Sequence, residues 1–359
     1  MSTEVPPVNP PGLVLITGIN GHIASAIALR LLEKGYRVRG TVRNLRSAAY
    51  LKKEFARFGD KLEFAETGSD ITSPGAFDKA LEGVDAVAHT ASPVRFDAKT
   101  KEDHYVPAVD GTLNILRSAK KVPTVKRFIY LGSLGSNVMT YKDYKKEKAT
   151  RDDWNVISEK LLEEIDNTHP AFAASVYFGS KIAAERAAWD FIKNEKPQFG
   201  LTVVNPGSVL GHIHKELTGP PPQDQTLGQL YDCLAKPPRI KVVSPYKDGT
   251  VVDAYDIGDL FAASLTSQKT VGVRLLGAAH RTSWAEVTEI VKAKWPGRTE
   301  YPVPDENAPR GDYPGSLDIQ FDTDLEKELL GGNWRSLEET VLAGAKDLIE
   351  KEERGWDKI

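Results

Sequence analysis

The sequence predicts an α/β protein built on a doubly wound parallel sheet, with a smaller α/β lobe attached. Three observations lead to this prediction. Short β-rich segments alternate with helical segments over the first two hundred residues, the first strand runs into a glycine-containing turn, and the alternation fades after residue 205 before it returns. Such alternation is typical of βαβ units, whose right-handed crossovers place helices on both faces of a parallel sheet.

The strands are indicated by short runs rich in β-branched and aromatic residues. In chain order they are 13–17 (LVLIT), 36–42 (YRVRGTV), 62–66 (LEFAE), 85–91 (DAVAHTA), 127–132 (RFIYLG) and 201–204 (LTVV). Between them lie helical segments such as 23–34 and 104–120. The pattern returns at 251–265 and 271–277, and Ser336 with Glu339 forms the capping-box sequence of a final helix.

Composition excludes several classes of protein. Hydrophobic residues make up 40% and charged residues 27% of the 359 residues, which is ordinary for a soluble globular protein. The net charge of −3 gives no basic surplus, so we expect no nucleic-acid or membrane partner. Cys233 is the only cysteine, which favours a reducing compartment. Residues 1–12 hold four prolines and no apolar core of a signal peptide. These features predict a cytoplasmic location.

The first predicted strand and helix are joined by glycines with a characteristic spacing. Gly18, Gly21 and Ala24 follow one another at intervals of three residues. In a dinucleotide-binding turn the first glycine makes the tight bend, the second lets the backbone approach a pyrophosphate, and the third small residue lets the helix pack closely. The helix N-terminus then attracts the phosphates. The spacing departs from G-x-G-x-x-G, so an ordinary strand–helix corner remains an alternative for this stretch alone.

The end of the second strand bears on the choice of cofactor. An NAD-binding protein usually places an acid about 20 residues beyond the first glycine, to hold the ribose hydroxyls. The segment VRGTVRNLR (38–46) has no acid but carries Arg39, Arg43 and Arg46. An arginine at this place suits a 2′-phosphate. Arg46 fits a solvated surface position, whereas Arg43 at the carboxyl end of the strand favours NADPH.

A tyrosine and a lysine four residues apart supply a candidate proton donor. Tyr177 and Lys181 lie in the helical segment 175–192 and therefore share one helix face. A nearby ammonium lowers the pKa of a phenol, which is ordinarily about 10. Ser133 ends the fifth strand, where its hydroxyl could bond to a substrate oxygen. The alternatives are a surface tyrosine beside a lysine, and a turn serine close to Ser136.

Taken together, these residues resemble the extended short-chain dehydrogenase/reductase family. The motifs are Thr17-Gly18-x-x-Gly21-x-x-Ala24, Ser133, Tyr177-x-x-x-Lys181 and NPGSVLG at 205–211. More narrowly, the segments VRGTVR, AHTASPV, VPAVDGTLNIL and AAERAAWDF are similar to the fungal NADPH-dependent aldehyde and ketone reductases, which are related to dihydroflavonol reductase and cinnamoyl-CoA reductase. The similarity extends from about residue 12 to about residue 350.

The resemblance implies an NADPH-dependent carbonyl reductase that transfers hydride to an aldehyde or ketone. Tyr177 would protonate the carbonyl oxygen, Lys181 would hold the ribose and lower the tyrosine pKa, and Ser133 would orient the carbonyl. The implied cofactor-binding residues are Thr17, Gly18, Asn20, Gly21, His22, Ile23, Arg43, Asp70, Ile71, Thr90, Ala91, Ser92, Pro206 and Val209. Two positions depart from the family: His22 stands where relatives usually carry Phe, and Gly132 replaces a common Ser.

The proline-rich start, the strand–helix alternation and its interruption after residue 205 suggest a division of the chain. We expect a disordered tail at 1–11, an NADP-binding Rossmann domain at 12–205 with 240–280, and a substrate lobe at 206–239 with 281–359. Phe96, Leu227 and Tyr231 lie in the apolar stretches best placed to cover a substrate, so we expect them to line its pocket. The expected partner is a small-molecule aldehyde or ketone, and the protein would be a monomer or homodimer.

Other functions fit the residues less well. LGSLG (131–135) lacks the first glycine of the hydrolase motif G-x-S-x-G. His212, His214 and Glu216 alternate like metal ligands on a strand, but no further cluster accompanies them, so we expect a solvated loop and no metal. A nucleotide-sugar epimerase or dehydratase uses the same catalytic residues but usually requires NAD, which Arg43 disfavours. A redox-silent NADP-binding regulator would not need Ser133, Tyr177 and Lys181 together.

Overall fold

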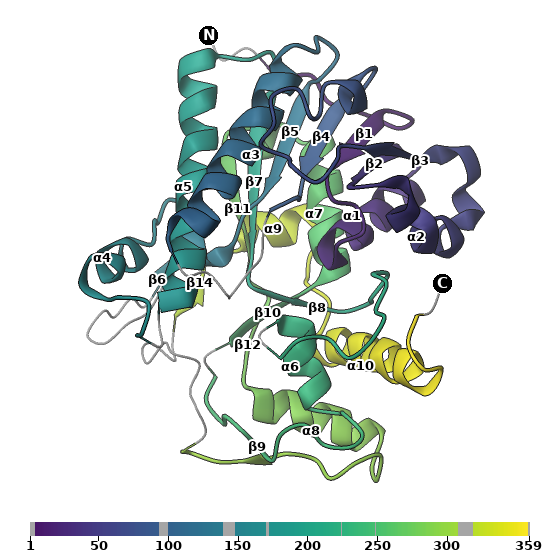
Figure 1. Cartoon of the computed structure of the whole chain (residues 1–359), viewed down its shortest axis with the longest axis vertical. Coiled ribbons are helices and arrows are strands. Elements are labelled where there is room, and N and C mark those ends of the chain that lie inside the picture. The colour runs from purple at the N-terminus through teal and green to yellow at the C-terminus, as the bar shows by residue number, and fades with distance from the viewer. Residues whose placement is uncertain are drawn as a thin grey trace.

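A seven-stranded parallel sheet forms the centre of the structure (Figure 1), a computed structural model that describes residues 4–92, 100–138, 148–169, 172–223, 225–247, 249–307 and 319–357. Its strands are β1 (Leu13–Ile16), β2 (Arg37–Val42), β3 (Leu62–Glu66), β4 (Ala86–His89), β5 (Arg127–Leu131), β7 (Gly200–Pro206) and β11 (Val273–Gly277). They lie in the order β11-β7-β5-β4-β1-β2-β3. The prediction of a doubly wound α/β fold is confirmed.

The strand order reverses beside β1. Val14 of β1 pairs with Val38 of β2 on one side and with Ala86 of β4 on the other. The chain therefore moves outward from β1 to β3 and returns to β4 on the opposite side. Open α/β sheets bind ligands at such a switch point, in the crevice beyond the carboxyl ends of the strands. The crevice here begins where β1 and β4 end.

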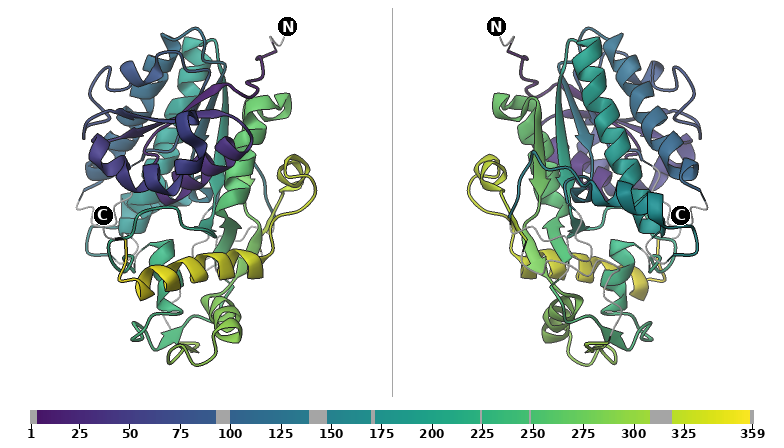
Figure 2. Two further views of the ribbon diagram at one scale, coloured as in Figure 1. Left: turned by 90° about the vertical axis from the view of Figure 1, so that its right-hand side faces the viewer. Right: turned by 90° about the vertical axis from the view of Figure 1, so that its left-hand side faces the viewer.

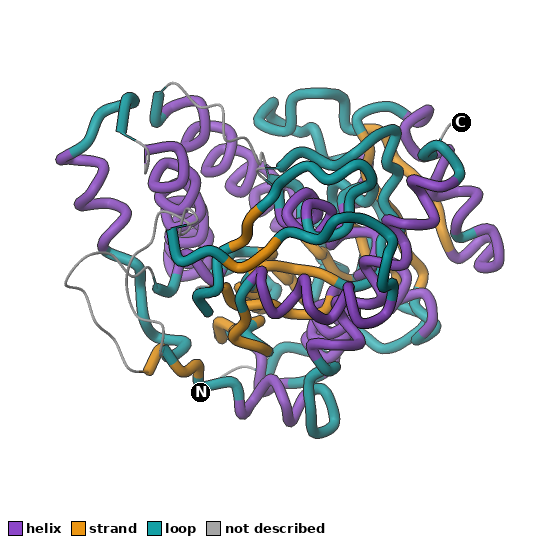
Figure 3. The backbone as a smooth tube through the Cα atoms, turned by 90° about the horizontal axis from the view of Figure 1, so that it is seen from below, coloured by secondary structure: helices purple, strands orange, loops and turns teal. Residues whose placement is uncertain are grey.

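Helices cover both faces of the sheet (Figure 3) because both sides of its strands are apolar. Leu13 and Leu15 point to the core beneath α3 (Glu102–Lys120) and α5 (Phe172–Glu195). Their neighbours Val14 and Ile16 belong to the core beneath α1 (His22–Glu33) and α7 (Ala254–Thr266). Burying each such side chain contributes roughly 1.5–3 kcal/mol, so the sequence alternation fixes the strand between two helical layers.

A second group of elements lies below the sheet. Its strands are β8 (Ser208–Leu210), β10 (Gly249–Asp253) and β12 (His280–Thr282), and its helices are α6 (Thr226–Asp232), α8 (Trp284–Lys294) and α10 (Leu337–Glu353). They share a core that includes Leu230, Val287 and Leu348. Figure 2 shows α10 crossing the molecule between the large sheet and α8. The capping box of Ser336 and Glu339 at the start of α10 is confirmed.

The remaining elements are short. They are α2 (Ala49–Glu54), α4 (Ile157–Glu164), α9 (Asp324–Leu329), the strand pairs β6 (Lys148–Ala149) with β14 (Gln320–Phe321) and β9 (Val242–Val243) with β13 (Val303–Pro304), and five 3-10 turns, η1 (Leu45–Ala48), η2 (Ala56–Lys61), η3 (Lys79–Leu81), η4 (Leu134–Ser136) and η5 (Gln268–Thr270).

The helix α9 packs on β11 and α7, although the sequence pattern placed its residues in the substrate lobe. The proposed domain boundaries stay a prediction. Among the described residues no helix is both long and apolar enough to cross a bilayer.

The expected disorder of the first eleven residues is wrong for residues 5–8. The guanidinium of Arg127 at the start of β5 is buried and donates to the carbonyl oxygen of Pro6 at 3.1 Å. The amide of Val8 donates to the carbonyl oxygen of Leu265 at 2.8 Å, and the Val8 side chain is buried. The proline-rich composition suggested a loose segment, but it gave no information about the buried arginine that requires acceptors from it.

Candidate functional site

The turn after β1 requires glycine for both conformation and space. Gly18 has a φ of +63°, in the left-handed region that side chains rarely adopt. A Cβ atom there would also lie 3.3 Å from the Cβ of Ala91. Gly21 donates its amide to the Gly18 carbonyl oxygen at 3.0 Å and precedes His22, the first residue of α1. The first N–H groups of α1 therefore open onto the crevice without a capping side chain, as an anion site requires.

Thr17 locks the ends of β1 and β4 together. Its hydroxyl oxygen accepts the amide protons of Thr90 and Ala91, both at 2.9 Å. The hydroxyl proton is then left for Nδ1 of His89, also 2.9 Å away. Burial, helped by the charge of Lys181, lowers the pKa of His89 to about 3, so the ring is neutral and can accept at this nitrogen. The segment that carries Thr90, Ala91 and the half-buried Ser92 is thus held rigidly beside the glycine turn.

The structure separates the three arginines of the second strand. Arg39 pairs with Glu63 of the neighbouring strand at 2.8 Å and donates to the backbone of η3. Arg43 and Arg46 are exposed, and neither side chain makes a hydrogen bond or ion pair with another described residue. Arg43 directly follows β2, at the sheet edge where the crevice opens. Its guanidinium is therefore available to an anion.

The turn after β3 is held in a fixed shape by its own side chains. Asp70 accepts hydrogen bonds from the amide of Thr72 at 2.9 Å and from the hydroxyls of Ser73 and Thr72, both at 2.6 Å. These bonds, Ser73 first, lower the pKa of Asp70 to about 2. Asn114 of α3 donates to the carbonyl oxygen of Ile71 at 2.8 Å. The role of Asn114 was not predicted, because a single asparagine in a helix gives no indication of a distant turn.

Ser133, Tyr177 and Lys181 are brought together by α5 and the end of β5. The hydroxyl of Ser133 accepts the amide proton of Gly135 at 3.2 Å and is hydrogen-bonded to the phenol of Tyr177. The Nζ atom of Lys181 lies 5.6 Å from the centre of the Tyr177 ring, one helical turn along the same face. The three side chains therefore form one polar cluster at the carboxyl edge of the sheet.

The ionisation of this cluster differs from the expectation. Burial raises the pKa of Tyr177 to about 12, although the Ser133 hydrogen bond opposes the rise. Burial also lowers the pKa of Lys181 to about 8. The pKa of Tyr177 is therefore raised and not lowered overall, because burial removes the phenolate from water, and the lowering contribution expected from Lys181 stays a prediction. The phenol consequently keeps its proton at neutral pH.

A buried ion pair supports this cluster from behind. Glu185, one turn beyond Lys181 on α5, is fully buried and pairs with Arg274 of β11 at 2.5 Å. The Arg274 guanidinium also donates to the carbonyl oxygen of Ser136 at 3.4 Å and lies 3.9 Å from the ring centre of Trp154. These contacts fasten α5, β11 and the turn after Ser133 to one another. This pair was not predicted, although a glutamate within the apolar run IAAERAAW could have indicated a buried partner.

The other predicted cofactor residues gather at the same edge. Pro206 ends β7 and Val209 lies buried in β8. Between them, the amide of Gly207 donates to the carbonyl oxygen of Gly277 at 2.9 Å. Asn20 is exposed in the glycine turn, and the half-buried Ile23 lies in the first turn of α1.

The predicted substrate residues lie in two places. Leu227 and Tyr231 are on α6, and both are buried in the core shared with α8 and α10. The Tyr231 hydroxyl donates to Glu352 of α10, and burial raises the pKa of the phenol. Phe96 lies outside the described residues. The assignment of these three residues to a substrate pocket stays a prediction.

The segment that alternates like a metal site is bonded to protein groups instead. His212 Nδ1 lies 3.1 Å from the Asp347 carboxylate. In His214, Nδ1 lies 3.0 Å from the Glu54 carboxylate and Nε2 lies 2.8 Å from the Tyr255 hydroxyl. The expectation of a solvated loop is wrong, because the His214 side chain is only 14% exposed. Across the described ranges, no group of three or more His, Cys, Asp or Glu side chains is arranged to hold a metal ion.

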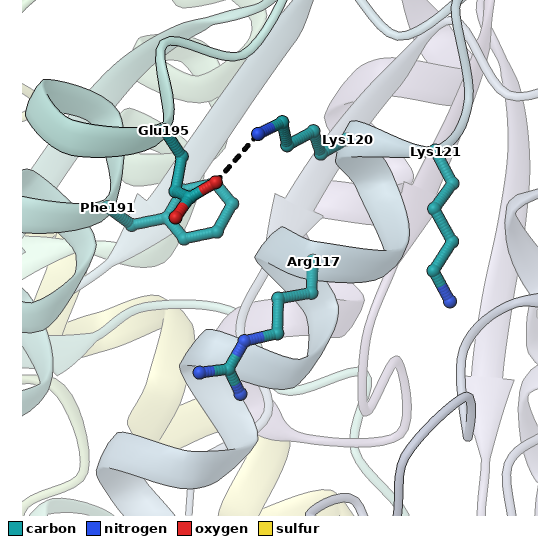
Figure 4. Close-up of a pocket in the computed structure, with 5 residues that line it drawn as sticks. All are labelled: Arg117, Lys120, Lys121, Phe191 and Glu195. Carbon is teal, nitrogen blue, oxygen red and sulfur yellow. Dashed lines mark hydrogen bonds and ion pairs between the residues drawn. The ribbon is translucent and has the colours of Figure 1, made fainter.

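The cavity shown in Figure 4 is separate from this cluster. It is lined by Arg117, Lys120, Lys121, Phe191 and Glu195. These residues lie near the C-terminal ends of α3 and α5, at the sheet edge opposite Ser133. Lys120 and Glu195 pair across it at 2.7 Å. None of the predicted site residues lines this cavity, so it carries no part of the candidate site.

Comparison with known proteins identifies relatives along almost the whole chain. Residues 14–263 match the sequence model of the NAD dependent epimerase/dehydratase family. The chain is 33% identical over 344 residues to aldehyde reductase 2 of Sporidiobolus salmonicolor, covering 95% of this chain and 96% of that protein. It is 30% identical over 351 residues to the ketoreductase azaE of Aspergillus niger, and the match covers 94% of this chain and 98% of that protein. The structure of the yeast methylglyoxal/isovaleraldehyde reductase Gre2 in complex with NADPH superimposes with a TM-score of 0.80 at 26% sequence identity. The match covers 95% of this chain and 99% of that chain.

Proposed function

The chain belongs to the NAD dependent epimerase/dehydratase family, and on that premise we propose that it is an NADPH-dependent carbonyl reductase. It transfers hydride to an aldehyde or ketone and yields an alcohol. The observation that carries the proposal is the cluster of Ser133, Tyr177 and Lys181 beside the glycine turn. The relatives named aldehyde reductase and ketoreductase, and the NADPH bound to the yeast reductase, support the choice of reaction and cofactor.

The residues around the crevice fit a phosphorylated dinucleotide. Gly18 and Gly21 leave room for a pyrophosphate at the N-terminus of α1, where N–H groups lack partners. Arg43, without an anionic partner among the described residues, suits the 2′-phosphate that distinguishes NADPH from NADH. The fixed turn of Asp70 and Ile71 borders the adenine, and Lys181 holds the nicotinamide ribose.

The chain supplies the proton for the reduction. NADPH, when bound, supplies the hydride to the carbonyl carbon. Tyr177 donates its phenolic proton to the carbonyl oxygen, which becomes an alkoxide-like base as the hydride arrives. Ser133 hydrogen-bonds the same oxygen and holds it near the phenol. The Lys181 ammonium stabilises the phenolate that remains until solvent restores its proton. With its pKa raised by burial, Tyr177 is protonated at neutral pH, as a proton donor must be.

A nucleotide-sugar epimerase remains the second candidate, because the family carries that name. Such enzymes usually use NAD, and no acid ends β2 to hold the ribose hydroxyls. A screen of NADPH oxidation with aldehydes, α-dicarbonyls, β-ketoesters and aryl ketones tests the proposal. Oxidation with at least one carbonyl class supports it. NADPH binding without turnover of any class would favour the regulator, and turnover of a nucleotide sugar with NAD would favour the epimerase.

Replacement of Arg43 by Ala is expected to weaken NADPH binding by about 1.5–3 kcal/mol, the range for a hydrogen bond to a charged group. NADH binding should barely change, because NADH lacks the 2′-phosphate. Fluorescence titration with both cofactors measures the difference. Arg46→Ala is the matched control, since Arg46 is also exposed but lies in η1, farther from the end of β2 than Arg43. Equal losses for NADPH and NADH in Arg43→Ala would contradict the assignment.

Cofactor affinity is expected to fall as the pH rises through about 8. The pKa of Lys181 is lowered to about 8 by burial, so the ammonium that holds the ribose is lost above that pH. Tyr177, with a pKa of about 12, does not titrate in this range. NADPH titrations between pH 6 and 10 measure the effect. Lys181→Arg should move the decline to higher pH, because a guanidinium stays charged. An affinity independent of pH up to 10 would refute the assignment.

A further inference from the structure

Asn205 is a buried polar residue that the proposed mechanism does not use. It opens the segment NPGSVLG at the end of β7, and its side chain is completely buried. Its Nδ2 atom donates to Oδ1 of Asn137 at 2.7 Å and to Oε2 of Glu185 at 3.2 Å. Asn137 directly follows η4, and Glu185 lies on α5. Asn205 therefore connects the turn after β5 with α5.

The oxygen of the same side-chain amide lies against Gly132. It makes no hydrogen bond with any residue in the described ranges. A Cβ atom at Gly132 would overlap it, so the oxygen occupies the space that a side chain at this position would take. The amide of Gly132 donates to the carbonyl oxygen of Val204 at 2.9 Å, which holds the end of β5 beside β7. A buried amide oxygen without a donor is unfavourable, so stability alone does not account for an asparagine here.

Ser133 lies between the two points of the chain that Asn205 contacts. Gly132 precedes it, and Asn137 follows it after the single turn η4. Within that turn the Ser133 hydroxyl oxygen accepts the amide proton of Gly135 at 3.2 Å. The hydroxyl is thus fixed relative to its own turn, and one side-chain amide holds the turn at both ends.

The other end of this connection is the helix that carries the proton donor. Tyr177, Lys181 and Glu185 follow one another along α5 at intervals of four residues, so each lies beside the next. Because Asn205 donates to Glu185 as well as to the turn, it links the two elements whose side chains meet in the cluster. The relative position of Ser133 and Tyr177 therefore depends on a residue from a third element, β7.

We propose that Asn205 is a positioning residue, which holds the Ser133 hydroxyl at the place beside the Tyr177 phenol where both can reach one carbonyl oxygen. The inference rests on the proposed carbonyl reduction and deepens it, since Asn205 acts through Ser133 and not on the substrate. A shift of the turn by about 1 Å would separate the two hydroxyls, and a misplacement of that size can lower a rate on the order of 10²-fold.

The first test is the rate of carbonyl reduction by Asn205→Ala. We expect kcat to fall by about 10- to 100-fold, whereas KM and the dissociation constant of NADPH stay within about twofold. In the Ser133→Ala background the same change should have no further effect, because the hydroxyl that it positions is already absent.

Thr202→Val is the matched control for the loss of a buried hydrogen bond. Thr202 lies on β7 three residues before Asn205, is also buried, and donates to the carbonyl oxygen of Thr270 at 2.8 Å. Because side chains alternate along a strand, it points to the opposite face of the sheet. This variant should leave kcat unchanged.

Gly132→Ala gives an independent test that keeps the asparagine. The added methyl group would displace the Asn205 amide, so this variant should show a similar fall in kcat. Combining it with Asn205→Ala removes the overlap, and the double variant should be no slower than Asn205→Ala alone. If Asn205→Ala does not fold, Asn205→Leu replaces it in these tests, because leucine has a similar volume and brings no polar atom of its own.

Crystal structures separate this inference from the proposed function. In Asn205→Ala the Ser133 hydroxyl should move out of hydrogen-bond distance of the Tyr177 phenol, and in Thr202→Val it should stay. An unmoved Ser133, an unchanged kcat, or a loss that simply adds to that of Ser133→Ala would overturn the inference, and so would a change confined to KM or to NADPH binding. If the unchanged protein reduces no carbonyl, the proposed function fails, and the structures still decide whether Asn205 positions Ser133.

Discussion

Replacement of Tyr177 by Phe is expected to lower the rate of carbonyl reduction by about 10³- to 10⁴-fold, the upper range for loss of a general acid. Only the phenolic oxygen is removed, so the ring still packs and NADPH should bind with unchanged affinity. The loss should appear in kcat and in kcat/KM alike, because the proton is transferred in the transition state. Steady-state kinetics and NADPH titration on the folded variant measure both quantities.

Two neighbouring substitutions separate the roles within the cluster. Ser133→Ala should have a smaller effect, on the order of 10²–10³ in rate, since it removes one hydrogen bond to the developing oxyanion. Lys181→Ala should impair cofactor binding and turnover together, because its ammonium serves both the ribose and the phenolate. Near-normal turnover by Tyr177→Phe would rule out the mechanism and favour a different acid or the regulator.

Replacement of Arg274 by Met is expected to destabilise the protein by about 3–5 kcal/mol, the range for removing one member of a buried ion pair. The fully buried Glu185 carboxylate would lose the guanidinium that neutralises it. It would keep only weaker contacts, such as the hydrogen bond that the side-chain amide of Asn205 donates at 3.2 Å. Urea denaturation followed by circular dichroism measures the change in the free energy of unfolding.

A double-variant cycle isolates the pair itself. Combining Arg274→Met with Glu185→Gln removes both charges and should recover a large part of the lost stability, because no uncompensated charge remains buried. If the two losses simply add, the carboxylate and guanidinium are not coupled and the pair does not fasten α5 to β11. A loss below about 1 kcal/mol in Arg274→Met would also contradict the prediction, because that is the size of a surface pair.

The sheet and the cluster of Ser133, Tyr177 and Lys181 could be predicted because local rules determine them. Two residues four apart share a face of any helix, whichever protein contains it. Parallel strands end at one edge of their sheet, so a serine at the end of β5 must lie near other groups at that edge. The glycine turn follows from the same argument, since its strand and helix are adjacent in the chain.

The features that escaped prediction depend on contacts between distant segments. Glu185 and Arg274 are 89 positions apart, and no local pattern indicates that β11 lies behind α5. The strand pairs β6–β14 and β9–β13 have two residues in each strand, too few for any alternation to be recognised. The direction of the Tyr177 pKa shift also depends on how deeply the folded chain buries the phenol, which the spacing to Lys181 does not reveal.

The hydroxyl of Thr17 gives the two sides of the crevice opposite polarity. Because it takes up the amide protons of Thr90 and Ala91, the β4 side has lost two donors that a ligand could otherwise use. The β1 side keeps the uncapped amides at the start of α1. The pyrophosphate of a bound dinucleotide would therefore be drawn to α1 and not to β4. One buried threonine thus helps to determine on which side of the crevice a phosphate would be held.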